Sequence, residues 1–135
     1  METALEHILI SAHKLEMISF MDKHSECFDE AIDLALSDKQ PFAWRAAWLL
    51  CSCTEENDIR FKDHIERIIN SITTKKDGHQ RELLKILLVM DLSEEQEGIL
   101  FDICVTIWES IGKVPSVRYM ELKFILKMAE KYPDL

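Results

Sequence analysis

The sequence predicts an all-α protein of about seven helices, and three observations support this fold class. The 135 residues include only 4 Val and 5 Thr, and no useful stretch alternates apolar with polar residues, so the material for a β-sheet is missing. Apolar residues instead recur three and four positions apart, as on one face of a helix. The chain is also long enough to bury roughly 68% of the surface that its unfolded form exposes, without disulfides or metal ions.

The first helical region covers the N-terminal 24 residues. Thr3 and Glu6 have the spacing of a capping box, in which each side chain accepts a hydrogen bond from the backbone N–H of the other. Apolar residues follow at helical spacing, which predicts one long or broken helix. These residues are Ala4, Leu5, Ile8, Leu9, Ala12, Leu15, Ile18 and Met21.

Two helices are predicted on either side of Pro41. The shorter one ends near residues 37–38, and its apolar positions are Phe28, Ala31, Ile32, Ala35 and Leu36. The next helix begins at Pro41, whose ring presets the backbone φ of a first helical residue. Its run PFAWRAAWLLCSC contains only Arg45 and Ser52 as polar side chains. We therefore expect this helix to be central and covered on nearly all sides.

Four further helices follow along the chain. Residues 61–72 are clearly amphipathic, and residues 79–90 form a second densely apolar helix. A third helix is indicated by an apolar stripe over residues 99–111, which follows a capping box at residues 93–96. The last helix follows Pro115. Because every connection is short, helices that are neighbours in sequence are expected to be antiparallel neighbours in space.

An internal period organises these helices. Arg45, Arg81 and Arg118 each lie in the first turn of a predicted helix, 36 and 37 residues apart, and an amphipathic helix precedes each one. One such pair of helices cannot hide its own apolar face, so the pairs are expected to stack into a right-handed α-α superhelix. The prediction is a single domain over residues 1–135, with a cap and three repeats at about 1–24, 25–56, 57–92 and 93–135.

Two segments carry a resemblance to a known family. PFAWRAAWLL (residues 41–50) and VPSVRYMELKFILKMAEKYPDL (residues 114–135) are similar to second helices of HEAT repeats, which often open with Pro and then Arg. The middle unit, KKDGHQRELLKILL (residues 75–88), replaces the Pro by Asp-Gly. Within the HEAT class, the WRAAW stretch and the YP ending resemble the DNA alkylation repair fold. The resemblance implies a HEAT-like solenoid that acts as an interaction scaffold.

The three arginines are candidate binding residues. The resemblance places second helices on the concave side of the solenoid, where Arg45, Arg81 and Arg118 would form a ladder able to pair with the carboxylates of an acidic peptide. The structural alternative is that each arginine pairs with a carboxylate at a helix end and fastens one unit to the next, and it is favoured because most strongly placed charges in repeat proteins are structural. The candidate partners for that role are Asp38, Asp77 and Glu109.

Trp44 and Trp48 are a second candidate binding pair. They lie four residues apart and thus on one helix face, and together with Trp108 they could form an aromatic platform. In the alkylation repair relatives, Trp, Asp and Arg side chains on the concave face act on DNA. Because Trp44 and Trp48 belong to the most apolar helix, the preferred interpretation is that they are core residues.

The charge balance argues against nucleic acid as a partner. Sixteen Lys and Arg against twenty-five Asp and Glu give a formal net charge of −9, which repels polyanions. The charge is also segregated, since residues 1–40 hold nine acids and three bases and residues 91–112 hold six acids and no base. These acidic stretches are interpreted as a solvated outer face, with an adapter that meets a basic partner as the alternative.

No metal or cofactor site is predicted. Cys51 and Cys53 are two residues apart and point away from each other on a helix, and no CxxC, HExxH or Gly-rich phosphate loop occurs. The four cysteines are read as reduced core thiols. The N-terminus lacks the features of a signal peptide and no window is long and apolar enough to span a membrane, which makes the cytoplasm the expected compartment.

The leading functional hypothesis is a non-enzymatic scaffold that binds another protein or an acidic peptide segment. The alternative is a DNA-binding protein or a DNA glycosylase related to alkylation repair. A homodimer is the third hypothesis, in which Phe124, Leu126 and Tyr132 of an exposed terminal unit pair with a second copy.

Overall fold

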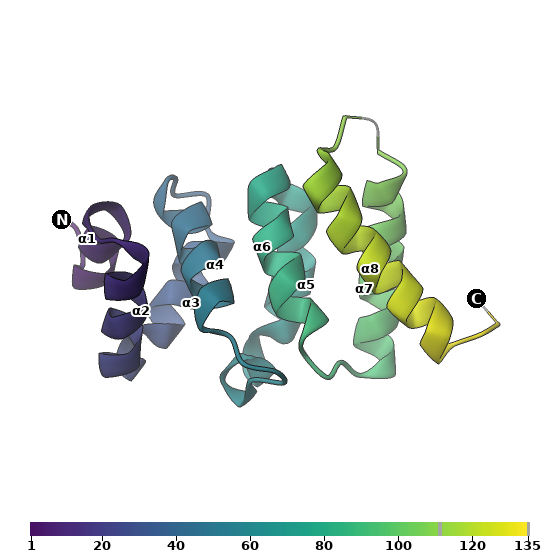
Figure 1. The fold of residues 1–135 in the computed structure, drawn as a ribbon, viewed down its shortest axis with the longest axis horizontal. Helices are drawn as coiled ribbons and strands as arrows, with labels where there is room; N and C mark the ends of the chain where they lie inside the picture. The colour runs from purple at the N-terminus through teal and green to yellow at the C-terminus, as the bar shows by residue number, and fades with distance from the viewer. Residues whose placement is uncertain (111, 135) are drawn as a thin grey trace. The chain divides into compact units, whose positions relative to one another are not determined.

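The computed structural model describes residues 1–110 and 112–134, and within them the protein is all-α (Figure 1). The described residues form eight α-helices and three short 3₁₀ helices, with no β-strand. The predicted fold class is therefore confirmed. The extra helix relative to the predicted seven arises at the N-terminus, where the helical region is broken.

The chain divides into two compact units, residues 1–55 and residues 56–135. The first unit contains α1 (Ala4–Ser11), α2 (Lys14–Lys23), η1 (Ser25–Cys27), α3 (Phe28–Leu36) and α4 (Phe42–Cys53). The second contains η2 (Ile59–His64), α5 (Ile65–Ser71), η3 (Ile72–Thr74), α6 (Asp77–Leu88), α7 (Glu94–Trp108) and α8 (Pro115–Lys131).

In the first unit, the N-terminal capping box forms as predicted. The Thr3 hydroxyl accepts from the Glu6 N–H at 3.1 Å, and the Glu6 carboxylate accepts from the Thr3 N–H at 2.9 Å. The backbone of Ala12 and His13 is extended, which ends α1 and starts α2. The apolar stripe continues across this break, and Leu5, Leu9 and Met21 are all buried.

Helix α4 packs against α3, α2 and α1 and supplies much of the core of the first unit. Its buried residues are Ala43, Ala46, Ala47, Leu49 and Leu50. The expectation that α4 is covered on nearly all sides is wrong, because Trp44 is 49% exposed and Arg45 is also exposed. Alanine and leucine side chains make the buried face of α4, and Trp44 lies outside it.

In the second unit, the amphipathic stretch predicted over residues 61–72 is not one regular helix. It consists of η2, α5 and η3 in succession, and Phe61, Ile68 and Ile72 of this stretch are buried. The capping box that precedes α7 forms as predicted, with the Ser93 hydroxyl accepting from the Gln96 N–H at 3.1 Å.

Helices α6, α7 and α8 complete the core of the second unit, and α8 packs against both α7 and α6. The apolar stripe of α7 places Leu100, Cys104 and Ile107 in that core. Ile111, with which the predicted stripe ends, lies outside the described residues.

Candidate interaction surfaces

Arg81 and Ser116 lie close together where α6 packs against α8. Arg81 is in the first turns of α6, and its guanidinium donates to the Ser116 hydroxyl at 3.3 Å. Ser116 stands two residues before Arg118 in the first turn of α8. Arg81 and Arg118, two of the three arginines predicted from the internal period, therefore lie on neighbouring helices of the second unit, but their side chains contact different partners.

Arg118 has its guanidinium stacked on an aromatic ring. The guanidinium carbon lies 4.6 Å from the ring centroid of Trp108, at the end of α7. Such a cation–π pair contributes about 0.5–1 kcal/mol at a partly exposed site. The side chain makes no hydrogen bond or ion pair with the described part of the chain. Stacking on Trp108 therefore restricts the half-buried guanidinium, whose N–H donors bond to no group of the described residues.

Arg81 forms an ion pair with a buried carboxylate, whereas Arg118 forms none with the described residues. Its Nε and Nη2 both lie 3.2 Å from one carboxylate oxygen of Glu82, whose side chain is only 4% exposed. Glu82 receives further support from Lys85, whose Nζ is 3.8 Å away. A buried carboxylate is costly without such partners. Arg81 thus compensates Glu82 within its own helix, and does not pair with the expected carboxylate at position 77.

Arg45 connects two helices of the first unit. Its guanidinium donates to the backbone carbonyl of Leu9 at 3.0 Å, in the last turn of α1. The last carbonyls of a helix have no partner inside it, and a cation there also suits the helix dipole. This contact corresponds to the fastening role expected for the arginines, with a carbonyl in place of a carboxylate.

The two tryptophans of α4 differ in burial. Trp44 is 49% exposed, so the core interpretation is wrong for this residue. Trp48 is half-buried, and the Lys14 ammonium lies 5.7 Å from its ring centroid. The third tryptophan, Trp108, is held under Arg118 in the second unit and is likewise half-buried.

Glu121 is a fully buried acid on α8. Neither of its carboxylate oxygens has a hydrogen-bond partner. Burial raises the pKa of Glu121 to about 7, although the charges of Lys113 and Arg118 work in the opposite direction. The same apolar environment raises the pKa of the buried Cys104 thiol to about 12, with a contribution from Glu121.

Lysine contacts, which the sequence reasoning missed, tie several segments together. Lys113 donates to Asp77 at 3.0 Å and to Gln80 at 2.8 Å, and the Val114 N–H donates to Asp77 at 2.9 Å. These hydrogen bonds hold the pKa of Asp77 below its ordinary value. In the first unit, Lys39 pairs with the buried Glu6. The sequence contains a pattern that could have indicated these lysines, because Lys39 lies six residues before Arg45 and Lys113 lies five residues before Arg118.

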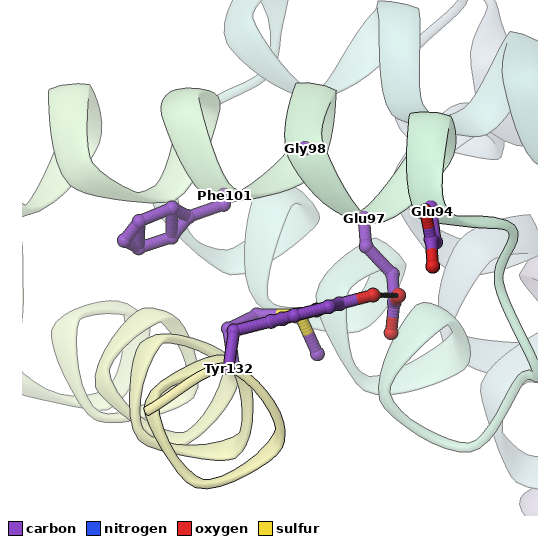
Figure 2. Close-up of a pocket in the computed structure, with 6 residues that line it drawn as sticks. Glu94, Glu97, Gly98, Phe101 and Tyr132 are labelled. Atoms are coloured by element: carbon purple, nitrogen blue, oxygen red, sulfur yellow. Dashed lines mark hydrogen bonds between the residues drawn. The ribbon is translucent and has the colours of Figure 1, made fainter. Parts of the chain in front are cut away.

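A pocket of about 240 Å³ opens between α7 and α8 (Figure 2). Glu94, Glu97, Gly98 and Phe101 line it from α7, and Met128 and Tyr132 line it from α8 and the residue that follows. Glu97 is 5% exposed and accepts from the Tyr132 hydroxyl at 2.7 Å. No motif pointed to this pocket, since its residues come from segments 27 or more positions apart.

Glu97 is ionised in this pocket. Burial alone raises its pKa, but hydrogen bonds from Lys131 and Tyr132 outweigh burial and hold the pKa below its ordinary value. The Lys131 ammonium lies 2.8 Å and 3.1 Å from the two carboxylate oxygens. The same hydrogen bonds raise the pKa of Lys131 and of Tyr132.

Comparison with known proteins identifies the family. The model of the HEAT repeat domain matches residues 1–135, the whole length of the chain. The chain belongs to the HEAT repeat family. Neither a curated protein nor a solved structure matches it significantly. The HEAT repeat assignment and the all-helical architecture together make this chain a helical repeat scaffold.

Two further features of this HEAT repeat chain bear on the sequence predictions. In the described residues, no three His, Cys, Asp or Glu side chains are grouped so that they could hold a metal ion, and no helix is long and apolar enough to cross a membrane. Of the residues proposed for a dimer contact, Phe124 is only 1% exposed and therefore belongs to the core, whereas Leu126 is 54% exposed.

Proposed function

We propose that this HEAT repeat chain is a non-enzymatic scaffold that binds an acidic segment of another protein through the arginines of its second helices. The observation that carries the proposal is Arg118, which is stacked on Trp108 and has no hydrogen-bond partner among the described residues. Stacking restricts the guanidinium before binding, so less conformational entropy is lost when a carboxylate pairs with it.

The neighbours of Arg118 favour an anionic ligand. The Ser116 hydroxyl and the Arg81 guanidinium lie within hydrogen-bond distance of each other at the start of α8. Arg81 keeps 30% of its side chain exposed even while it contacts Glu82. An acidic peptide that follows the start of α8 could therefore pair with the Arg81 guanidinium and the Ser116 hydroxyl as well as with Arg118.

We also propose a repeat arrangement that agrees with the internal period. Each of the three arginines lies near the start of α4, α6 or α8, and α3, α5 and α7 precede these helices in turn. The pairs α3–α4, α5–α6 and α7–α8 correspond to repeats at about 25–56, 57–92 and 93–135, with residues 1–24 as the cap. In a right-handed superhelix of this order, the second helix α4 would present Arg45 and the exposed Trp44 on the concave side. We therefore include Trp44 and Trp48 among the proposed binding residues.

The test is a fluorescence anisotropy titration with a fluorescein-labelled peptide of alternating Glu and Gly. We expect the full chain to bind it at low salt, and Arg118→Gln to weaken the affinity at least about fivefold, because a charge-assisted hydrogen bond contributes more than about 1 kcal/mol. Trp44→Ala in the same assay tests whether the exposed Trp44 ring contributes to the affinity for the peptide. Lys123→Gln on α8 is the matched control and should change the affinity less than about twofold.

Two results would contradict the proposal. The first is a wild-type protein that does not bind the acidic peptide, and the second is an Arg118→Gln variant that is folded by circular dichroism and binds like wild type. A labelled duplex with a methylated base serves as the competing probe, because the exposed Trp44 is the feature that favours the DNA-binding alternative. Duplex binding stronger than peptide binding would replace the scaffold proposal.

A further inference from the structure

Glu121 is a buried acid without a polar partner in the second unit. Its side chain is 0% exposed, and neither carboxylate oxygen has a hydrogen-bond partner among the described residues. A buried carboxylate normally pairs with a cation or accepts hydrogen bonds, because burying an unpaired charge is costly. Glu97, for comparison, pairs with Lys131. Because Glu121 has no such pair, a proton is what neutralises this carboxyl group.

Charged and titratable groups act on Glu121 from each element around it. Burial has the largest effect and raises the pKa of Glu121 to about 7. The charges of Lys113, before α8, and Arg118, on α8, oppose this rise in pKa, whereas that of Asp77 on α6 adds to it. Helix α7 contributes the Cys104 thiol, whose own pKa is raised by burial and further by Glu121. Glu121 therefore exchanges its proton near neutral pH.

Glu121 lies one helical turn after Arg118 on α8. Residues three positions apart are neighbours on a helix. Because an electrostatic interaction is mutual, the ionised Glu121 acts on Arg118 just as Arg118 acts on Glu121. Its negative charge lowers the positive potential at Arg118, and salt screens this interaction only weakly because Glu121 is buried. A proton on Glu121 removes that negative charge.

We propose that Glu121 is a proton switch for Arg118, so that a proton on Glu121 and an acidic segment on Arg118 favour each other's binding. This inference rests on the function proposed above for Arg118. By reciprocity, a bound acidic segment strengthens proton binding by Glu121 by the same factor. Binding therefore takes up a proton at neutral pH, and the affinity for the acidic segment rises as the pH falls from 8 to 6.

The test repeats the anisotropy titration with the Glu and Gly peptide at pH 6 and at pH 8, at the same low salt. The carboxylates of the peptide are ionised at both pH values. We expect wild type to bind at least about threefold more tightly at pH 6. Glu121→Gln should bind at pH 8 about as tightly as wild type binds at pH 6. Glu130→Gln, an exposed change on the same helix, should keep the pH dependence of wild type.

Histidine is the other side chain that titrates in this pH range, so it needs its own control. His79 is buried on α6, two residues after Asp77. His79→Gln should keep the pH dependence of peptide binding, whereas Glu121→Gln should lose it. The opposite pattern would overturn the assignment of the switch to Glu121.

A second readout does not need the peptide. The Arg118 Nε–H signal in a ¹H–¹⁵N spectrum, assigned by its loss in Arg118→Gln, should shift between pH 6 and pH 8 in wild type and stay in place in Glu121→Gln. A wild-type protein that binds no peptide at either pH would contradict the proposed function, and the Arg118 signal would then decide the switch. Equal peptide affinity at both pH values, or an unmoved Arg118 signal, would overturn the switch and leave the proposed function standing.

Discussion

Glu121 is the residue whose ionisation opposes the fold. It lies fully buried on α8 without a hydrogen-bond partner, and its pKa is raised from 4.5 to about 7 by burial. The folded state therefore holds the proton more tightly than the unfolded state. The stability that the protonated form contributes is fully present below about pH 4.5 and is lost as the pH rises through about 7.

Glu121→Gln should remove this pH dependence. We expect the variant to be more stable than wild type at pH 8 by up to about 3 kcal/mol, since one pKa unit corresponds to about 1.4 kcal/mol. At pH 5 the two proteins should differ much less. Urea unfolding at both pH values measures the effect, and Glu130→Gln, an exposed change on the same helix, is the control. An equal difference at pH 5 and pH 8 would show that Glu121 is not the titrating group.

Asp77 shows how a single side chain joins elements. It lies in the first turn of α6 and accepts from Lys113 and from the Val114 N–H, both in the segment before α8. A carboxylate in this position also suits the N-terminal end of the helix dipole. The start of α6 is thereby connected to the segment that leads into α8, where Arg118 lies in the first turn.

Asp77→Ala should lower the free energy of unfolding by about 1–3 kcal/mol, because it leaves the Val114 N–H without its acceptor and removes one of the two acceptors of Lys113. The pKa of Asp77 is lowered in the fold, so its contribution is present above the ordinary value of 3.8 and is lost as the pH falls through the folded value. Denaturant unfolding at pH 7 measures the loss. Asp102→Ala, exposed on α7, should change stability by less than about 0.5 kcal/mol, and an equal loss in both variants would argue against the contact.

For the whole molecule, the division into residues 1–55 and 56–135 gives a further prediction. Glu55, Glu56 and Asn57 are exposed and lie between α4 and η2, outside any helix. Exposed chain of this kind is the preferred substrate of proteases. A protease specific for glutamate should therefore cut first after Glu55 or Glu56 and produce two large fragments.

Mass spectrometry of the first fragments checks this prediction. The double variant Glu55→Gln and Glu56→Gln should resist this early cut, while its later cleavage inside the helices stays unchanged. A first cut within α7, which carries three glutamates in its opening turn, would contradict the prediction.

Some features of the fold were predictable because they are local. The two capping boxes involve residues three positions apart, and the apolar stripes of α6 and α8 depend only on helical period. The break between α1 and α2 was left open because no Gly or Pro marks it. The exposure of Trp44 was not predictable from composition, since burial depends on which face of α4 meets α1, α2 and α3.

The sequence alone determined the all-helical class, because helical periodicity is local, and the 36- and 37-residue spacing of the three arginines, because residue order is given directly. The HEAT character followed from the resemblance of two segments to second helices of that family. Tertiary structure decided what these side chains contact. Arg45 reaches the Leu9 carbonyl 36 residues away, Lys113 reaches Asp77 across 36 residues, and the pocket joins Glu97 with Tyr132 across 35. Such pairings form only when separate helices pack, and packing depends on the summed shape of many side chains, which no single motif encodes.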